Sequence, residues 1–412
     1  MKKTPILRYL AFWLTTLLVF CLLQIAFLPR GEVLRWRNFY ALPRNTVDVV
    51  FLGTSHAYHS FNPEVIDDIL PITSHSLGIP GDNIQIVYHE IRSILRSQQP
   101  DLILVDAFSL SMSNWLDGPY IYRFLNASFA PPNIISAADI LFKNDYDWWN
   151  YFPLIRNNQD WKNLDKLMSN PVSNTPPEYP ENPQGHAPLT TIITDADYAA
   201  IPMEDFLPLP EHYLTYLQKV IDTTRKENVQ LAFVDTLWKG FENPFYDLYD
   251  RSKEFRLLSK EAIPYYDFRT YPLAYDWSQV HMYDRDHPSE FGSLIISVRT
   301  AELISTMLGL PIDQQKLAWY QNFYFDEFSL VQDADQITLS LVPANPAAPL
   351  YYRWQLLAWD EASPLSEAIF TDEPFVTLET PAPGSYRIAV AITQPGGDYE
   401  LEGRFALFIT EP

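Results

Sequence analysis

The stretch VVFLGTSHAYHSF, residues 49 to 61, decides the fold class that this sequence predicts. Four apolar residues run into Gly53, which is followed by Thr54, Ser55 and His56. A glycine and small polar residues after an apolar run are typical of the point where a buried strand passes into a helix. In open α/β sheets, ligands bind at the carboxyl ends of such strands. Ser55 is therefore a candidate functional residue.

Predicted strands and helices alternate downstream of this stretch. Asn62 and Pro63 are residue types that cap and open a helix. Strands separated by helices indicate an α/β fold, a flavodoxin-like parallel sheet with flanking helices. The expected strands are 47–52, one each in ITSHSL and PDLILVDAF, 229–235 and PYYDF, and the expected helices are 62–70, IVYHEIRSIL, 211–227, a segment near 252–262 and SLIISVRTAELISTML.

The sequence divides into three predicted parts. Residues 1–45 hold a membrane anchor and a juxtamembrane segment, residues 46–316 the α/β domain, and residues 317–412 a C-terminal β-sandwich of immunoglobulin-like type. Within the α/β domain, residues 112–208 are an insertion, rich first in aromatic residues and then in proline. We expect helices followed by an extended loop, which either shapes a substrate site or covers the fold. The C-terminal part is expected to stabilise or space the protein, or else to bind a glycan or a protein.

The anchor prediction depends on Tyr9 to Leu28, a run of twenty residues without a charge. This length matches one membrane-spanning helix. A cleaved signal peptide is the alternative, but the apolar run is longer than usual and no small-residue cleavage site follows it. Basic residues flank the run on both sides, so they do not set its orientation. We expect a single-pass cell-membrane protein with the main domain outside the cytoplasm.

Charge and composition exclude several classes of protein. The formal net charge is −22, and residues 1–45 alone carry +6, so the rest of the chain carries −28. A nucleic-acid partner is not expected, because phosphate binding requires a basic surface. Because Cys21 is the only cysteine, the chain can form neither an intrachain disulfide nor a cysteine-based metal cluster. Neither a Walker loop nor a dinucleotide fingerprint is present, and no cofactor is expected.

A base for Ser55 is expected in HMYDRDHPSEFG, residues 281–292. A nucleophilic serine requires a base, and the base requires a group that orients it. His287 is the candidate base and Asp284, three residues earlier, is the candidate orienting group, whereas Asp286 is adjacent and less suitable. A doubly wound sheet would bring this loop to the edge where Ser55 lies.

These motifs resemble the blocks of the SGNH hydrolases, also called the GDSL family, over roughly residues 45 to 310. GTSH at 53–56 resembles the block with the nucleophilic serine, and DRDH at 284–287 resembles the terminal Asp-x-x-His block. LGIPGDN at 77–83 resembles the second block, which implies that the amides of Ser55 and Gly81 form an oxyanion hole. The third block departs from the family, because no Gly-x-Asn follows LILVDAFSLS and Asn114 is too far along.

The resemblance implies a serine acyl-esterase or an O-acyltransferase, of the divergent membrane-anchored branch that acts in bacterial envelopes. FPLIRNNQDWKNL at 152–164 also resembles a segment of that branch. The expected substrate is a cell-envelope polysaccharide or a related ester. The missing third-block asparagine supports the alternative, a non-catalytic envelope scaffold or binding protein that keeps the fold.

Simpler interpretations remain open for several residues. Gly53-Thr54-Ser55 is also a common way to begin a helix, and an Asp/His pair in a loop is often only solvated. His56 and His59 either line the site or lie on a helix face, and Trp238 and Trp277 either stack on sugar rings or pack against the protein. His281, Asp284, Asp286 and His287 are metal-ligand types, but no metal is expected, because such residues in one loop do not by themselves make the required geometry.

Overall fold

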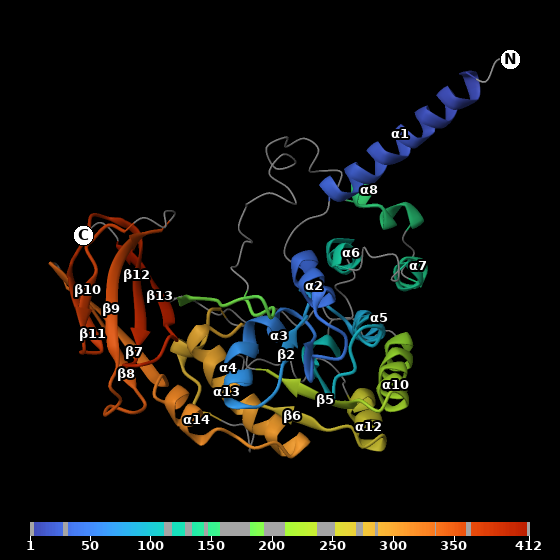
Figure 1. Cartoon of the computed structure of the whole chain (residues 1–412). Helices are drawn as coiled ribbons and strands as arrows, with labels where there is room; N and C mark the ends of the chain where they lie inside the picture. Colours follow the sequence, from blue (N-terminus) through green and yellow to red (C-terminus); the bar gives the residue numbers. More distant parts are fainter. Residues whose placement is uncertain are drawn as a thin grey trace.

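The computed structural model describes residues 4–27, 32–110, 118–127, 134–143, 147–156, 182–192, 211–236, 252–268, 275–284, 287–333, 335–359 and 364–409. An N-terminal helix projects from a central sheet that helices cover on both faces, and two C-terminal sheets lie on the side of the body away from that helix (Figure 1).

The central sheet has five strands in the order β2-β1-β3-β5-β6, and all of its pairings are parallel. This is the flavodoxin-like order, in which the winding direction changes between β1 and β3. The predicted fold class is confirmed. The strands are β1 (Val49–Leu52), β2 (Ser74–Ser76), β3 (Leu102–Asp106), β5 (Gln230–Asp235) and β6 (Tyr265–Asp267).

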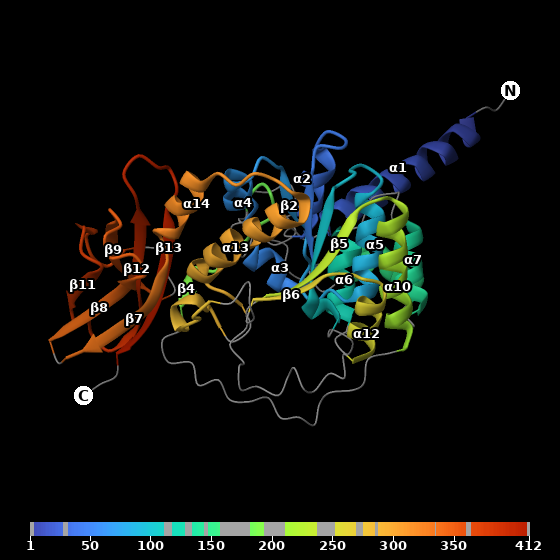
Figure 2. The same ribbon diagram turned by 90° about the horizontal axis from the view of Figure 1, so that it is seen from below.

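Strand β1 shows why this sheet has helices on both faces. Successive strand residues point to opposite faces, and every residue of β1 is buried. Val49 and Phe51 join the core beneath α4 (Pro63–Ile69) and α13 (Glu290–Leu308). Val50 and Leu52 join the opposite core, and Figure 2 shows these two layers on either side of the sheet. Helices that contribute to the opposite core include α2 (Glu32–Ala41), α5 (Ile84–Ile94), α10 (Glu211–Lys226) and α12 (Ser252–Lys260), together with two helices of the insertion described below.

The predicted helix signal at Asn62 is confirmed, and an additional helix precedes it. The Asn62 side chain accepts a hydrogen bond from the Glu64 amide, and Pro63 is the first residue of α4. The additional helix, α3 (Ser55–Ser60), begins at Ser55 and is capped by Thr54, whose side chain accepts from the His56 amide. The sequence analysis did not predict α3, because six residues are too few to show a helical period.

The described parts of the insertion contain both of the expected kinds of structure. Its helical elements are α6 (Gly118–Ala127), α7 (Ile134–Lys143), the 3-10 turn η3 (Trp148–Tyr151) and α8 (Pro153–Arg156). Residues 182–192 begin with a turn at 183–185, continue without helix to the short strand at 191–192, and bind by backbone to three distant elements. The Ser76 amide donates to Gln184, the Ala187 amide to Tyr58 and the Glu290 amide to Leu189. These bonds fix the described segment to β2, α3 and α13, and its role as a cover or as part of a substrate site stays a prediction.

Two sheets form the C-terminal part, with strand orders β10-β9-β12-β13-β4 and β11-β8-β7. Strand β4 comes from the insertion and pairs in parallel with β13. Phe325 and Phe405, both fully buried, belong to the same hydrophobic core as β1 and α13. The predicted boundary at residue 316 stays a prediction. The elements are β4 (Thr191–Ile192), α14 (Gln314–Gln321), β7 (Phe325–Gln332), β8 (Gln336–Pro343), β9 (Tyr351–Ala358), β10 (Ile369–Thr371), β11 (Phe375–Glu379), β12 (Gly384–Thr393) and β13 (Leu401–Ile409).

Helix α1 (Thr4–Ala26) contains the predicted anchor. Its Ile6–Ala26 segment is long and apolar enough to cross a membrane, and none of its apolar window is buried. Glu290–Leu308 passes the same test of length and composition but is mostly buried, because it is the core helix α13. Within the described ranges, α1 is therefore the exposed apolar helix that could anchor the protein, and its orientation stays a prediction.

Candidate active site

Ser55, His287 and Asp284 lie together, as the sequence predicts. The Nε2 atom of His287 is 2.7 Å from Ser55 Oγ, and its Nδ1 atom is 3.0 Å from Asp284 Oδ2. Nδ1 facing a carboxylate carries the imidazole proton, which leaves the lone pair of Nε2 for the hydroxyl proton of Ser55. This is the geometry of an activated serine.

Two tight pieces of backbone hold these residues in place. Ser55 is the first residue of α3, immediately beyond the carboxyl end of β1. Asp284 and His287 lie in a turn between the 3-10 helix η6 (Gln279–His281) and α13. The His287 amide donates to Asp284 Oδ1 at 2.7 Å, and the Tyr283 amide donates to the His287 carbonyl at 3.0 Å. The carboxylate therefore fixes both the backbone and the ring of His287.

Two further histidines from α3 pack against His287. The rings of His56 and His59 lie edge-on to it, with centroids 5.2 and 5.3 Å away. Burial lowers the pKa of both imidazoles well below its usual value, and the nearby His287 lowers it further. Both rings are therefore neutral near pH 7. His59 also donates from Nδ1 to the carbonyl of Ala187, which ties the insertion to the site.

Asp106, at the end of β3, holds the loop that carries Ser55. Its Oδ2 accepts from the Thr54 hydroxyl at 2.7 Å and from the Thr54 amide at 3.3 Å. Gly53 has a φ of +125° and allows the ends of β1 and β3 to approach closely. A Cβ at position 53 would lie only 2.6 Å from the Asp106 Cβ. Burial raises the pKa of the Asp106 carboxyl to about 7, although the bonds from Thr54 act in the opposite direction. The sequence analysis missed Asp106, whose signal was a carboxylate at the end of an apolar strand.

The second block packs directly on this loop. A Cβ on Gly78 would lie 2.8 Å from the Thr54 carbonyl oxygen, and the Ile79 amide donates to Gly53 at 2.9 Å. Gly81 lies three residues beyond Gly78 in the same loop, with a left-handed φ of +75° that favours glycine. The role of the Ser55 and Gly81 amides as oxyanion donors stays a prediction.

Three buried ionisable side chains, Asp82 within the second block and Arg35 and Glu90 outside it, lie at this loop, and the sequence analysis did not identify them as buried. The Arg35 guanidinium of α2 donates to the Gly78 carbonyl and lies over the Tyr58 ring, 4.2 Å from its centroid. Asp82 and Glu90 are fully buried, and burial raises the pKa of the Glu90 carboxyl. The helix next to the anchor thus contacts the loop that contains Gly81.

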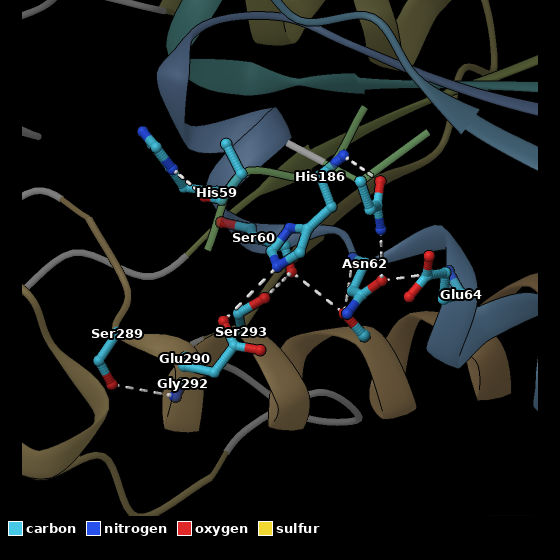
Figure 3. A network of polar contacts seen from close by, with 12 residues as sticks. His59, Ser60, Asn62, Glu64, His186, Ser289, Glu290, Gly292 and Ser293 are labelled. Carbon is cyan, nitrogen blue, oxygen red and sulfur yellow. Dashed lines mark hydrogen bonds and ion pairs between the residues drawn. The ribbon is translucent and has the colours of Figure 1, made fainter. Parts of the chain in front are cut away.

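His186, from the insertion, lies between α3 and the beginning of α13 (Figure 3). Its Nδ1 donates to the Tyr58 carbonyl at 3.0 Å, and its Nε2 is 3.7 Å from Glu290 Oε2. The hydroxyls of Ser293 and Ser297 donate to the Ser60 carbonyl nearby. These contacts join α3 to α13 and so support the Ser55 and His287 backbones.

The remaining candidate residues either use their polar groups in contacts within the protein or lie outside the described residues. The Trp277 indole donates to the Phe268 carbonyl at 3.1 Å and contacts the rings of Tyr275 and His281, which favours the packing interpretation. Both ring nitrogens of His281 bind backbone groups of Ser278 and Phe325. No group of three or more potential metal ligands occurs among the residues that the structure describes. Asn114, Trp238 and Asp286 lie outside those residues.

No family model matches the chain, and no curated protein matches it in sequence. Solved structures do match, at low identity and low TM-score. One is a putative lipolytic protein of the G-D-S-L family from Desulfitobacterium hafniense, with 10% identity, a TM-score of 0.33 and coverage of 63% of this chain and 99% of that chain. A psychrotrophic esterase from Pseudoalteromonas sp. gives 10% identity, a TM-score of 0.32 and coverage of 64% and 99%.

A third match spans both halves of this chain. It is a two-domain esterase active on acetylated mannans, with 9% identity, a TM-score of 0.31 and coverage of 91% of this chain and 94% of that chain. The fold and site described here follow from this structure's own strand order and contacts. A parallel sheet in the order β2-β1-β3-β5-β6, with Ser55 after β1 and with Asp284 and His287 before α13, gives this chain an SGNH-hydrolase-like fold.

Proposed function

We propose that this protein is a membrane-anchored serine acyl-esterase or O-acyltransferase that acts outside the cytoplasm. The observation that carries the proposal is the pair of contacts made by His287, with Ser55 Oγ at 2.7 Å and Asp284 Oδ2 at 3.0 Å. A structural histidine does not require a serine hydroxyl at one nitrogen and a carboxylate at the other. The same contacts are those that acyl transfer needs.

The proposed reaction proceeds through an acyl-serine. Ser55 Oγ attacks the ester carbonyl carbon while His287 Nε2 accepts the hydroxyl proton. The tetrahedral oxyanion is stabilised by the amides of Ser55 and Gly81. His287 then returns the proton to the leaving alcohol oxygen as the carbon–oxygen bond breaks. Water or an acceptor hydroxyl attacks the acyl-Ser55 ester, again with His287 as base, and restores Ser55.

The proposed substrate is an ester of a cell-envelope polysaccharide. This follows from the exposed apolar helix α1 and from the resemblance of the sequence blocks to the envelope branch of the SGNH hydrolases. Water as acceptor makes the protein an esterase, and a sugar hydroxyl as acceptor makes it an acyltransferase. Incubating the protein with an acetyl ester and a polysaccharide, then measuring free acetate against acetylated polysaccharide, distinguishes the two.

A non-catalytic scaffold is the alternative, and one observation favours it. No Gly-x-Asn follows β3, and the strand ends in Asp106, whose carboxylate accepts a hydrogen bond from the Thr54 hydroxyl and supplies no donor to the site. A scaffold would keep the fold without turning over esters.

Labelling with a fluorophosphonate separates the two functions. The full-length protein should be labelled at Ser55, and Ser55→Ala should abolish both labelling and ester hydrolysis. Ser60→Ala is the matched control, because Ser60 lies in the same helix and its hydroxyl has no hydrogen-bond partner among the described residues. Equal hydrolysis of acetyl and longer acyl esters by folded wild-type and Ser55→Ala proteins would assign the chain to the scaffold class.

A further inference from the structure

The short segment Asp147–Arg156, which contains η3 and α8, packs against the C-terminal end of α1 (Figure 1). The rings of Phe152 and Phe20 are in edge contact, with centroids 5.6 Å apart, and the Leu154 amide donates to Gln24 Oε1 at 3.2 Å. Phe20, Gln24 and Phe27 are spaced to lie on one helix face. Gln24 is only 4% exposed and Phe27 5%, whereas every residue from 6 to 19 is exposed, from Leu7 at 72% to Val19 at 49%.

These contacts conflict with a bilayer that surrounds α1 alone. Fourteen residues, 6 to 19, precede the covered part of the helix, and they span about 21 Å at 1.5 Å per residue. The hydrocarbon core of a bilayer is about 30 Å thick, and a tilted helix covers even less of it. The rest of the hydrocarbon core must therefore surround Phe20 to Ala26, which is the part of α1 that Asp147–Arg156 contacts.

The surface of the segment suits this position. Trp148 and Trp149 are 47% and 49% exposed and lie against each other, and Ile155 is 38% exposed. Tryptophan is enriched where hydrocarbon meets the headgroups, because its indole combines an apolar body with one polar donor. Three exposed apolar side chains next to a membrane helix therefore have an identifiable partner, the lipid around that helix.

Most of the polar groups described in this segment have hydrogen-bond partners in the protein, which lowers the cost of entering lipid, and Nη2 of Arg156 is the buried exception among the described residues. The Arg156 guanidinium is buried and donates to Asn126 Oδ1 at 2.7 Å and to the Asn150 carbonyl at 3.0 Å. The amides of Asn150, Phe152, Ile155 and Arg156 all donate to backbone carbonyls within the segment. Asp147 is exposed, so it must stay at the headgroups and limits the depth to the interfacial layer.

We propose that Asp147–Arg156 is a second membrane contact, an interfacial hairpin that inserts Trp148, Trp149 and Ile155 into the bilayer that holds α1. This inference rests on the membrane anchorage in the proposed function, and it is independent of the esterase chemistry. Two attachments would restrict how the α/β domain rotates over the membrane, which a single helix does not do.

The test measures the depth of nitroxide labels in the full-length protein, reconstituted into phosphatidylcholine bilayers. Cys21→Ala removes the only cysteine, and single cysteines are then introduced by Trp149→Cys or Ile155→Cys. Trp13→Cys, in the exposed part of α1, is the reference inside the bilayer, and Phe370→Cys, 75% exposed on β10, is the reference in water. Collision rates with oxygen and with a water-soluble nickel complex report depth.

Labels at 149 and 155 should be more accessible to oxygen, and less to the nickel complex, than the label at 370, with a depth shallower than at 13. Accessibility at both sites equal to that at 370, while position 13 is buried in lipid, would overturn the inference. A water-exposed label at 13 would also overturn it, because α1 would then lie outside the bilayer. If the labels read interfacial depth but fluorophosphonate fails to label Ser55, the esterase proposal fails and the membrane contact stands.

Discussion

At the scale of single residues, both ring nitrogens of His287 have a partner, and the two histidines that pack against its ring are neutral. Asp284 faces Nδ1, Ser55 faces Nε2, and the rings of His56 and His59 pack edge-on. Burial keeps His56 and His59 from being protonated, because it lowers the pKa of both. In the proposed reaction, the positive charge that His287 gains from the Ser55 proton therefore lies opposite the Asp284 carboxylate, with His56 and His59 neutral beside it.

The first prediction concerns the carboxylate of this group. Asp284→Asn should lower kcat for ester hydrolysis by about 10⁴, because the amide no longer holds the proton on Nδ1 and the wrong tautomer faces Ser55. The fold should persist, since an amide oxygen can still accept from the His287 backbone. Asp286→Asn is the matched control and should cost much less. Steady-state kinetics on folded proteins decides the matter, and equal losses in the two variants would contradict the assignment of Asp284.

At the scale of elements, two loops at neighbouring strand ends form one unit. The loop after β1 and the loop after β2 touch at Thr54 and Gly78, and Asp106 at the end of β3 holds the first loop. Arg35 of α2 contacts the second loop at the Gly78 carbonyl. The positions of the Ser55 and Gly81 amides therefore depend on four elements.

The second prediction tests the conformation of the second loop. Gly81→Ala should lower kcat by about tenfold or more with little change in KM, because a Cβ at φ of +75° strains the loop and shifts an amide needed chiefly when the oxyanion forms. Gly396→Ala is the control, since Gly396 has φ of +78° and lies in open surroundings in the C-terminal part. It should lose similar stability and no turnover. A kcat for Gly81→Ala equal to that of Gly396→Ala would remove Gly81 from the site.

At the scale of the whole molecule, the central and C-terminal parts share one hydrophobic core. Phe291, in the first turn of α13, is 2% exposed, and its ring lies 5.5 Å from Phe325 and 6.4 Å from Phe405. The Phe325 carbonyl binds His281 Nε2 at 2.7 Å, and the Arg404 amide donates to Thr190. The C-terminal sheets therefore support the helix α13 and the residues just before it, which include Asp284 and His287.

The third prediction concerns this shared core. Phe291→Ala should lower the free energy of unfolding by about 3 kcal/mol or more, because it leaves a cavity between α13 and the C-terminal sheets. Phe370→Ala should change it by at most about 0.5 kcal/mol, since that ring is 75% exposed. Denaturant unfolding in detergent measures both. A loss for Phe291→Ala as small as for Phe370→Ala would show that the two parts do not depend on this contact.

The fourth prediction is that stability falls as the pH rises from about 6.5 to 8. Burial raises the pKa of Asp67 to about 6 and of Asp106 to about 7, and it also raises the pKa of Glu90. Such carboxyls keep a proton in the folded state that the unfolded state has lost, so their contribution to stability is lost as the pH rises to the folded-state pKa. The loss from Asp67 is nearly complete at about pH 6.5, and Asp106 and Glu90 cause the fall above it.

Buried histidines change the stability in the opposite direction, so that it rises with pH, and they do so over a lower pH range. Burial lowers the pKa of His75 and His281 to about 4, so their contribution rises from about pH 4 and is complete above about 6.5. Only the carboxyl effect then remains, on the order of 1 kcal/mol. Melting temperatures in detergent at pH 6.5 and 8 measure it, and Asp106→Asn should make the fall smaller. A fall of the same size in both proteins would exclude Asp106 as its source.

The sequence alone determined most of the strand and helix order of the α/β domain, apart from α3, and the apolar N-terminal helix, and it singled out Ser55, Asp284 and His287 as candidates. These follow from local signals: apolar runs, the Asn62-Pro63 helix opening, and an Asp-x-x-His spacing that three bonds within one turn can satisfy. Hydrophobic period and spacing are properties of a few consecutive residues, so they can be recognised without knowing what packs against them.

Only the tertiary structure decided which distant residues support that site. Asp106 with Thr54, Arg35 with Gly78, and His186 beside Glu290 are separated by 43 to 104 positions, and none of these residues has a local pattern that names its partner. The same holds for Phe152 against Phe20. Such contacts depend on burial and charge summed over elements that meet only when the chain has folded, and the free energy of a buried charge is set by those neighbours rather than by its place in the sequence.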